Sequence, residues 1–86
     1  MSAVTEIIAR LLVISEEAEH ILAALDGADA DLDSAGHYAE QAGRVSPQPC
    51  GEAAAALAAE AKRDIASARG ALSDLRSAAA GYAGTL

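Results

Sequence analysis

Two groups of polar residues have spacings that metal-binding or catalytic sites use. Glu17 and His20 are three residues apart, which in ferritin-like bundles places two iron ligands on one side of a helix. A complete site of that kind needs a second Glu-x-x-His segment, and the sequence has none. The pattern therefore favours a solvated helix surface with a Glu16–His20 contact over a metal site.

The other reactive side chains are similarly isolated. His37 and Glu40 lie one helical turn apart beside Asp33, which is typical of an exposed polar surface. Cys50 is the only cysteine, which excludes a disulfide within the chain and leaves a free thiol or a cross-link between two chains. No basic neighbour in the sequence activates this thiol. We therefore expect no catalytic, cofactor-binding or metal-binding residues and no enzymatic activity.

The charge of −7 is unevenly distributed over the 86 residues. Residues 1–45 contain nine acidic and two basic residues, whereas residues 46–86 contain four of each. An acidic chain without a basic patch argues against binding to nucleic acid or anionic membranes. The acidic first half suits a basic protein partner.

The apolar segments are too short for a membrane. No run approaches the roughly 18 residues that a membrane span needs. The run Ile7–Ile14 is interrupted by Arg10, and no basic segment precedes it, so it does not resemble a signal peptide. We expect a cytoplasmic protein, with export without a cleaved signal peptide as the alternative.

The apolar residues of the first half recur at spacings that alternate between four and three residues. This 3.5-residue repeat predicts a long helix with a left-handed seam against another helix. The repeat consists of Ile7, Leu11, Ile14, Ala18, Ile21, Leu25, Ala28, Leu32, Ala35, Ala39 and Ala42.

The second half has the same alternation, which predicts a second long helix. Between the two repeats, Pro47 and Pro49 lie between glycines and predict a turn. We expect one domain over residues 1–86, with helices over about 3–43 and 51–83 and a turn over 44–50. Ser2 is the expected N-cap of the first helix. Because Gly and Asp are poor helix formers, a break near Gly27 or Gly36 is the alternative to a continuous first helix.

The short turn predicts an all-α, antiparallel two-helix hairpin. Its expected seam contains Ile7, Leu11, Ile14, Ile21, Leu25, Leu32, Ile65, Leu72, Leu75 and Tyr82. Five apolar residues fall outside this seam and are the expected partner interface. They are Ile8, Leu12, Val13, Leu22 and Leu57. A small Ala-rich core buries little area, so we expect dimerisation into a four-helix bundle, or a heterodimer with another helical protein.

This architecture resembles the small substrates of type VII secretion, which are acidic helical hairpins that pair as dimers. Their Trp-x-Gly turn is missing from Ser46–Gly51, and Leu86 stands where their tail signal has an acid four residues after Tyr82. The segment Val4–Leu11, the Ala-rich repeats and Tyr82 are also similar to Ala-rich accessory proteins of high-GC Gram-positive bacteria. This resemblance implies an accessory or chaperone-like partner of a secreted effector or toxin. The alternative is a structural, self-assembling bundle without a foreign partner.

Overall fold

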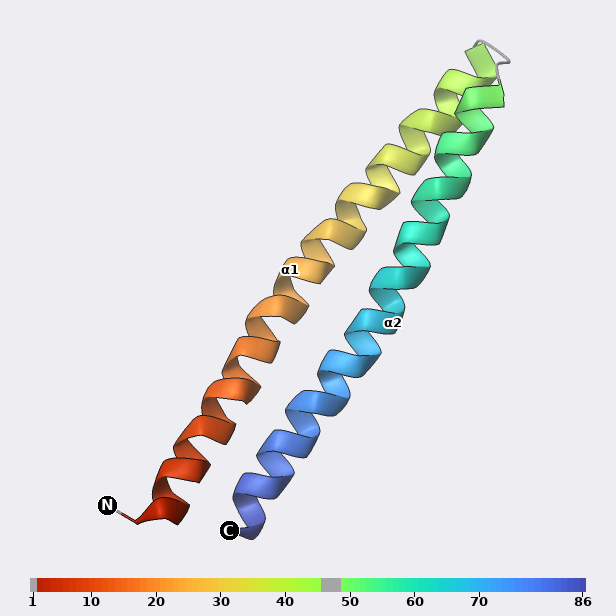
Figure 1. Ribbon diagram of the computed structural model, residues 1–86. Coiled ribbons are helices and arrows are strands. Elements are labelled where there is room, and N and C mark those ends of the chain that lie inside the picture. The colour runs from red at the N-terminus through yellow and green to blue at the C-terminus, as the bar shows by residue number, and fades with distance from the viewer. Residues whose placement is uncertain (1, 46–48) are drawn as a thin grey trace. The chain divides into compact units, whose positions relative to one another are not determined.

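The chain forms two long helices. The computed structural model describes residues 2–45 and 49–86, without the side chains of residues 49 and 50. Helix α1 spans Ala3–Val45, and helix α2 spans Pro49–Thr85 (Figure 1). α1 therefore ends two residues later than the expected boundary, and α2 is two residues longer at each end. Residues 46–48 of the expected turn lie outside the described residues.

Local sequence explains where the helices start and stop. The backbone N–H of Thr5 donates to Ser2 Oγ at 3.1 Å, which confirms Ser2 as the N-cap of α1. Arg44 lies in the last turn of α1, where a cation is favourable for the helix dipole. α2 begins at Pro49 because a proline in the first helical position loses no hydrogen bond.

Helix α1 is continuous through its glycine-containing stretch. Gly27 and Gly36 both lie inside the helix, and no described glycine has a positive φ. A glycine costs about 1 kcal/mol in a helix interior relative to alanine. That cost is spread over 43 residues of unbroken repeat, so packing rather than local propensity keeps the helix intact.

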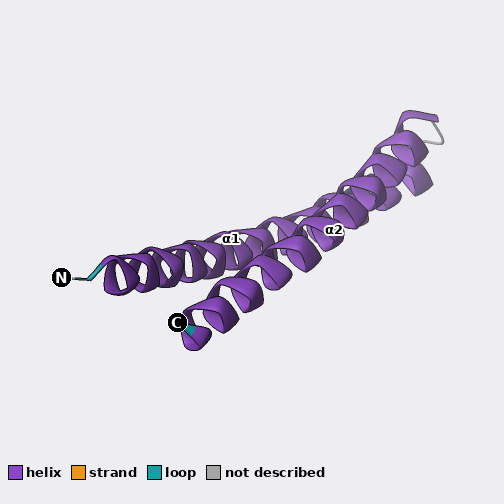
Figure 2. Ribbon diagram, turned by 60° about the horizontal axis from the view of Figure 1, so that its bottom comes forward, coloured by secondary structure: helices purple, strands orange, loops and turns teal. Residues whose placement is uncertain are grey.

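The chain divides into two compact units. The terminal unit comprises Met1–Ala24 and Ala68–Leu86, and the turn unit comprises Leu25–Ser67. In each unit, a segment of α1 lies beside a segment of α2 and runs in the opposite direction (Figures 1 and 2). The expected all-α, antiparallel helical hairpin is thus confirmed.

Three adjacent stripes of residues along each helix describe how the helices pack. In α1, the inner stripe is 8, 15, 22, 29, 36 and 43, the middle stripe is 11, 18, 25, 32 and 39, and the outer stripe is 7, 14, 21, 28, 35 and 42. In α2, the inner stripe is 55, 62, 69, 76 and 83, the middle stripe is 58, 65, 72 and 79, and the outer stripe is 54, 61, 68, 75 and 82. The inner and middle stripes of α1 are all at least half-buried, and its outer stripe is entirely exposed.

The helices therefore meet through the inner and middle stripes, which corrects the expected seam. Five expected seam residues lie in the middle stripe and are half-buried: Leu11, Leu25, Leu32, Ile65 and Leu72. The other five lie in the outer stripe and are 41–55% exposed: Ile7, Ile14, Ile21, Leu75 and Tyr82. The repeat was correct, but the helices are rotated so that the residue after each outer-stripe position turns inward.

Small side chains explain this rotation. The two most buried side chains among the described residues are Ala18 and Ala79, which are 2% and 5% exposed. In the turn unit, a Cβ added to Gly51 would lie 3.1 Å from the Cα of Gly43 and 3.3 Å from the carbonyl oxygen of Ala39. Backbones approach this closely only where side chains are minimal. Ala18, Ala39 and Ala79 of the middle stripe and Gly43 of the inner stripe allow that approach, whereas isoleucines at these positions would hold the helices apart.

Candidate interaction surface

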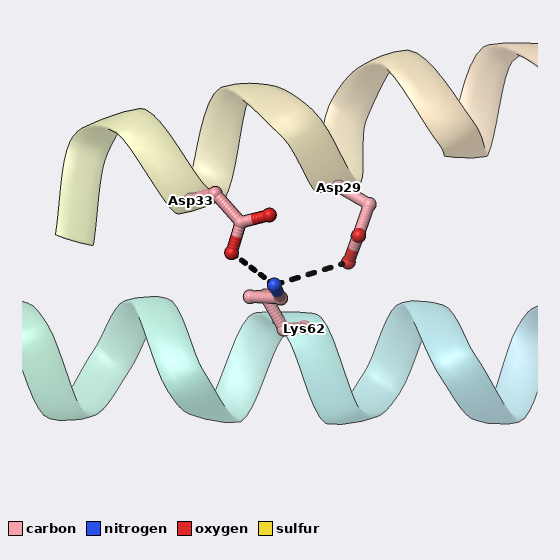
Figure 3. A network of polar contacts seen from close by, with 3 residues as sticks. All are labelled: Asp29, Asp33 and Lys62. Atoms are coloured by element: carbon pink, nitrogen blue, oxygen red, sulfur yellow. Dashed lines mark hydrogen bonds and ion pairs between the residues drawn. The ribbon is translucent and has the colours of Figure 1, made fainter. Parts of the chain in front are cut away.

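One side of the seam is ionic. In the turn unit, the Lys62 ammonium donates to the Asp33 carboxylate and lies 3.8 Å from Oδ1 of Asp29, so one lysine of α2 bridges two acids of α1 (Figure 3). The hydrogen bond to Asp33 is the main reason that the pKa of Lys62 is raised above its ordinary value of 10.5. Lys62 is an inner-stripe residue, so its charge replaces an apolar contact in the seam.

The terminal unit has an ion pair of the same kind. Arg76 Nη1 lies 3.5 Å from Glu19 Oε1. Both pairs fit the same antiparallel register. Residues that lie opposite in such a register have residue numbers with a constant sum, and 19 and 76 have the same sum as 33 and 62. Arg76 follows Lys62 by two heptads in the inner stripe, and Glu19 precedes Asp33 by two heptads beside it. The acids thus flank the inner stripe of α1 on the side away from the outer stripe.

The other side of the seam is apolar. In both helices, the outer stripe is displaced from the seam in the same rotational sense. Two antiparallel helices are related by a two-fold axis perpendicular to both helices. Because this axis exchanges the helices without exchanging the two sides of the pair, the outer stripes of both helices lie on the same side. Within the terminal unit, this rule places Ile7, Ile14 and Ile21 of α1 on the same side as Leu75 and Tyr82 of α2.

This apolar surface belongs to one unit. Nine large apolar side chains that are more than 40% exposed lie in the terminal unit, and three lie in the turn unit, among the described residues. The outer stripe shows the cause, because it carries isoleucine, leucine and tyrosine in the terminal unit. In the turn unit, the same stripe carries only alanine: Ala28, Ala35, Ala42, Ala54 and Ala61.

The expected partner interface is divided by the structure. Ile8 and Leu22 belong to the inner stripe and are half-buried between the helices, so they are not on the free surface. Leu12, Val13 and Leu57 are 53%, 55% and 64% exposed. Leu57 belongs to the turn unit, apart from the other four. The difference follows from the rotation of the helices. This rotation turns Ile8 and Leu22 toward the seam and leaves the outer-stripe isoleucines exposed in their place.

The register of the ion pairs was a sequence signal for this rotation. Basic residues recur at 62, 69 and 76, and acids recur at 19, 26, 33 and 40, each with a spacing of seven. Two such series suit neighbouring helices only if both flank the seam. Apolar periodicity alone does not show whether the inner or the outer stripe faces the other helix, because the two lie on either side of the same middle stripe.

Residues considered for chemistry remain dispersed. Glu17, His20, His37 and Glu40 are all exposed, and the side chain of Cys50 lies outside the described residues. Among the side chains that are described, no group of three or more His, Cys, Asp or Glu could hold a metal ion. A shallow groove of about 230 Å³ runs beside Gly36, His37, Glu40 and Lys62. Neither helix, within its described residues, has an apolar stretch long enough to cross a membrane.

The chain matches no protein-family model, no curated protein and no solved structure. The interpretation of its surface therefore depends on geometry and charge. Those two properties single out the outer stripe of the terminal unit, where large apolar side chains are exposed on neighbouring helices.

Proposed function

We propose that this chain is a non-catalytic helical interaction protein that completes its core against helices of a partner chain. The observation that carries the proposal is that, in the terminal unit, small side chains are buried while large apolar side chains are exposed. Its most buried side chains are alanines, while Ile7, Ile14 and Ile21 are 41–47% exposed. Large apolar side chains left exposed along one side of a small protein are typical of an interaction site.

The area left uncovered supports the proposal. The accessible surface is 5939 Å². A compact monomer of 8.6 kDa exposes about 4,700 Å². The excess of about 1,200 Å² exceeds the roughly 800 Å² that each partner loses in a protein interface of standard size. The chain therefore leaves more surface uncovered than a compact protein of its mass, as expected for a chain that completes its core against a partner.

The role that best suits such a surface is that of an accessory or chaperone-like partner of a type VII-type secreted effector or toxin, acting in the cytoplasm. The resemblance in architecture and composition supports this role, and the exposed apolar stripe supplies a place for the helices of an effector. A self-assembling structural bundle is the alternative, and the uniform, uncharged character of the outer stripe favours it.

Co-expression with the products of neighbouring genes tests the accessory role. We expect a helical product to co-purify with the wild-type chain and to be lost with Ile14→Glu/Ile21→Glu, which places charge on the outer stripe of the terminal unit. The matched control is Ala28→Glu/Ala35→Glu, which places the same charge on the outer stripe of the turn unit and should retain the product. If no neighbouring product co-purifies with the wild-type chain, the accessory role is wrong.

A further inference from the structure

We propose that the outer stripe of the terminal unit is occupied by the same stripe of a second copy of this chain, with the two α1 helices antiparallel and Ile14 opposite Ile14 of the second copy. This inference rests on the proposed helical interaction function and names its first partner. Three observations carry it: the spacing of the isoleucines, the charges that flank them, and the distribution of charge between the units.

The isoleucines are arranged symmetrically about Ile14. Ile7 and Ile21 lie seven residues before and after it in the same exposed stripe. When two copies of this segment run antiparallel with the Ile14 side chains opposite each other, Ile7 meets Ile21 of the second copy and Ile21 meets Ile7. A shift by one heptad in either direction leaves one isoleucine of each copy without an isoleucine opposite it. The stripe is therefore most complementary to itself in this one register.

The flanking charges have the same symmetry. Arg10 and Glu17 are seven residues apart and both border the outer stripe on the side away from the seam. In the register centred on Ile14, Arg10 faces Glu17 of the second copy, and Glu17 faces Arg10. The Arg10 side chain is 79% exposed, and its Nη2 lies 3.4 Å from Oε1 of Glu6 in its own helix. Opposite charges bordering an apolar stripe specify partner and orientation in helix pairs.

The charge of the two units favours contact through the terminal unit. The terminal unit has five acidic and three basic residues and a formal charge of −2. The turn unit has eight acidic and three basic residues and a formal charge of −5. Two copies meeting through their terminal units bring together the less charged parts of both chains. Association through the turn units would oppose the larger charges and bury only alanine from the outer stripe.

Sedimentation equilibrium of the purified chain tests the partner, and charge reversal tests the register. We expect a dimer for the wild-type chain, and a dissociation constant about tenfold higher for Arg10→Glu or Glu17→Arg, because each places two like-charged pairs in the interface. The double variant Arg10→Glu/Glu17→Arg restores opposite charges and should return to within about threefold of wild type. Arg63→Glu and Asp64→Arg make the same charge changes in the turn unit and should leave the dimer unchanged.

A cross-link tests the orientation independently of charge. Ile14→Cys in a Cys50→Ser background should give a disulfide-linked dimer on mild oxidation, since the two thiols face each other across the two-fold axis. Leu57→Cys in the same background is exposed in the turn unit and should give none.

The outcomes separate this inference from the function on which it rests. A monomer at all concentrations, a dimer that ignores both charge reversals, or a dimer without the cross-link at position 14 would overturn the inference. If a monomer still co-purifies with a neighbouring gene product, the interaction function stands and the partner is a foreign helix. A dimer with the expected variants and no such product supports the inference and contradicts the accessory role.

Discussion

The terminal unit and the turn unit share one packing scheme and differ in what they leave uncovered. In both, α1 and α2 meet through the inner and middle stripes, and an ion pair lies at one side of the contact. The outer stripe is alanine in the turn unit and isoleucine, leucine and tyrosine in the terminal unit. The turn unit has therefore no large apolar stripe to cover, and the terminal unit has one.

This difference shows that closeness of packing and apolar content are separate properties in a helical hairpin. Glycine and alanine allow the helices to approach, yet they contribute little burial energy, since burial scales with apolar area. The large side chains of the outer stripe could contribute more, but they lie outside the contact between the helices. Those of the terminal unit consequently become a surface, and the comparison can be tested one feature at a time.

The largest effect is expected in the terminal unit at its most buried position. Ala18→Leu should lower the free energy of unfolding by about 1–3 kcal/mol, because no space exists for a larger side chain between the helices. Ala35→Leu makes the same change at an exposed outer-stripe position and should stay within about 0.5 kcal/mol. Urea denaturation followed by circular dichroism measures both. Equal effects at the two positions would contradict the assignment of the seam.

The next effect is expected in the turn unit, at the closest approach of the helices. Gly51→Ala should destabilise the chain by about 1 kcal/mol, because its Cβ would press on the backbone of Gly43. Gly70→Ala is the control, since no atom lies within 4 Å of the added Cβ. It should stabilise the helix by about 0.5–1 kcal/mol. Thermal unfolding distinguishes the two, and stabilisation by both would refute the close approach.

A smaller effect is expected from the ion pair of the terminal unit. Glu19→Arg and Arg76→Glu should each cost about 0.2–1 kcal/mol, because exposed pairs of opposite charge contribute little. The double variant should recover most of that cost, since it restores the pair with reversed charges. A double-mutant cycle in low-salt urea denaturation gives the coupling energy. Additive costs would show that the two side chains do not interact in solution.

The smallest effect concerns the corresponding pair of the turn unit and its dependence on pH. Because the pKa of Lys62 is raised in the folded chain, its contribution is complete below 10.5 and is lost as pH rises through the raised value. Lys62→Arg keeps its charge in this range and is the control for all other groups that titrate in alkali. Circular dichroism of both proteins from neutral pH to about pH 12 measures the difference. Identical alkaline transitions would contradict the predicted loss.

The sequence was sufficient for the hairpin and for half of its seam. The 3.5-residue repeat predicted both helices, and their continuity through Gly27 and Gly36 followed from the unbroken phase of that repeat. The boundaries differed by two residues at three ends, because Arg44 and Pro49 favour helix where the glycines suggested a turn.

The candidate interaction surface is harder to predict, because hydrophobicity alone assigns apolar side chains to the inside. Ile14 lies in the outer stripe, and Asp29 lies in the inner stripe. A prediction from apolarity alone would place the isoleucine inside and the aspartate outside. Asp29 turns inward because Lys62 reaches it across the seam at 3.8 Å. Asp29 thus takes part in a charge pair across the seam, which a prediction from apolarity alone misses, while the outer-stripe isoleucines stay exposed.

The buried alanines also bear on how the stability of the folded chain depends on its concentration. Because the most buried side chains among those described are the alanines Ala18 and Ala79, we expect the isolated chain to have a small margin over unfolding. Binding of a partner at a concentration 100-fold above its dissociation constant adds about 2.7 kcal/mol to that margin. If the proposed interaction holds, copies made in excess of a partner would unfold more often and be exposed to proteases, so the amount of folded protein would follow the amount of assembled protein.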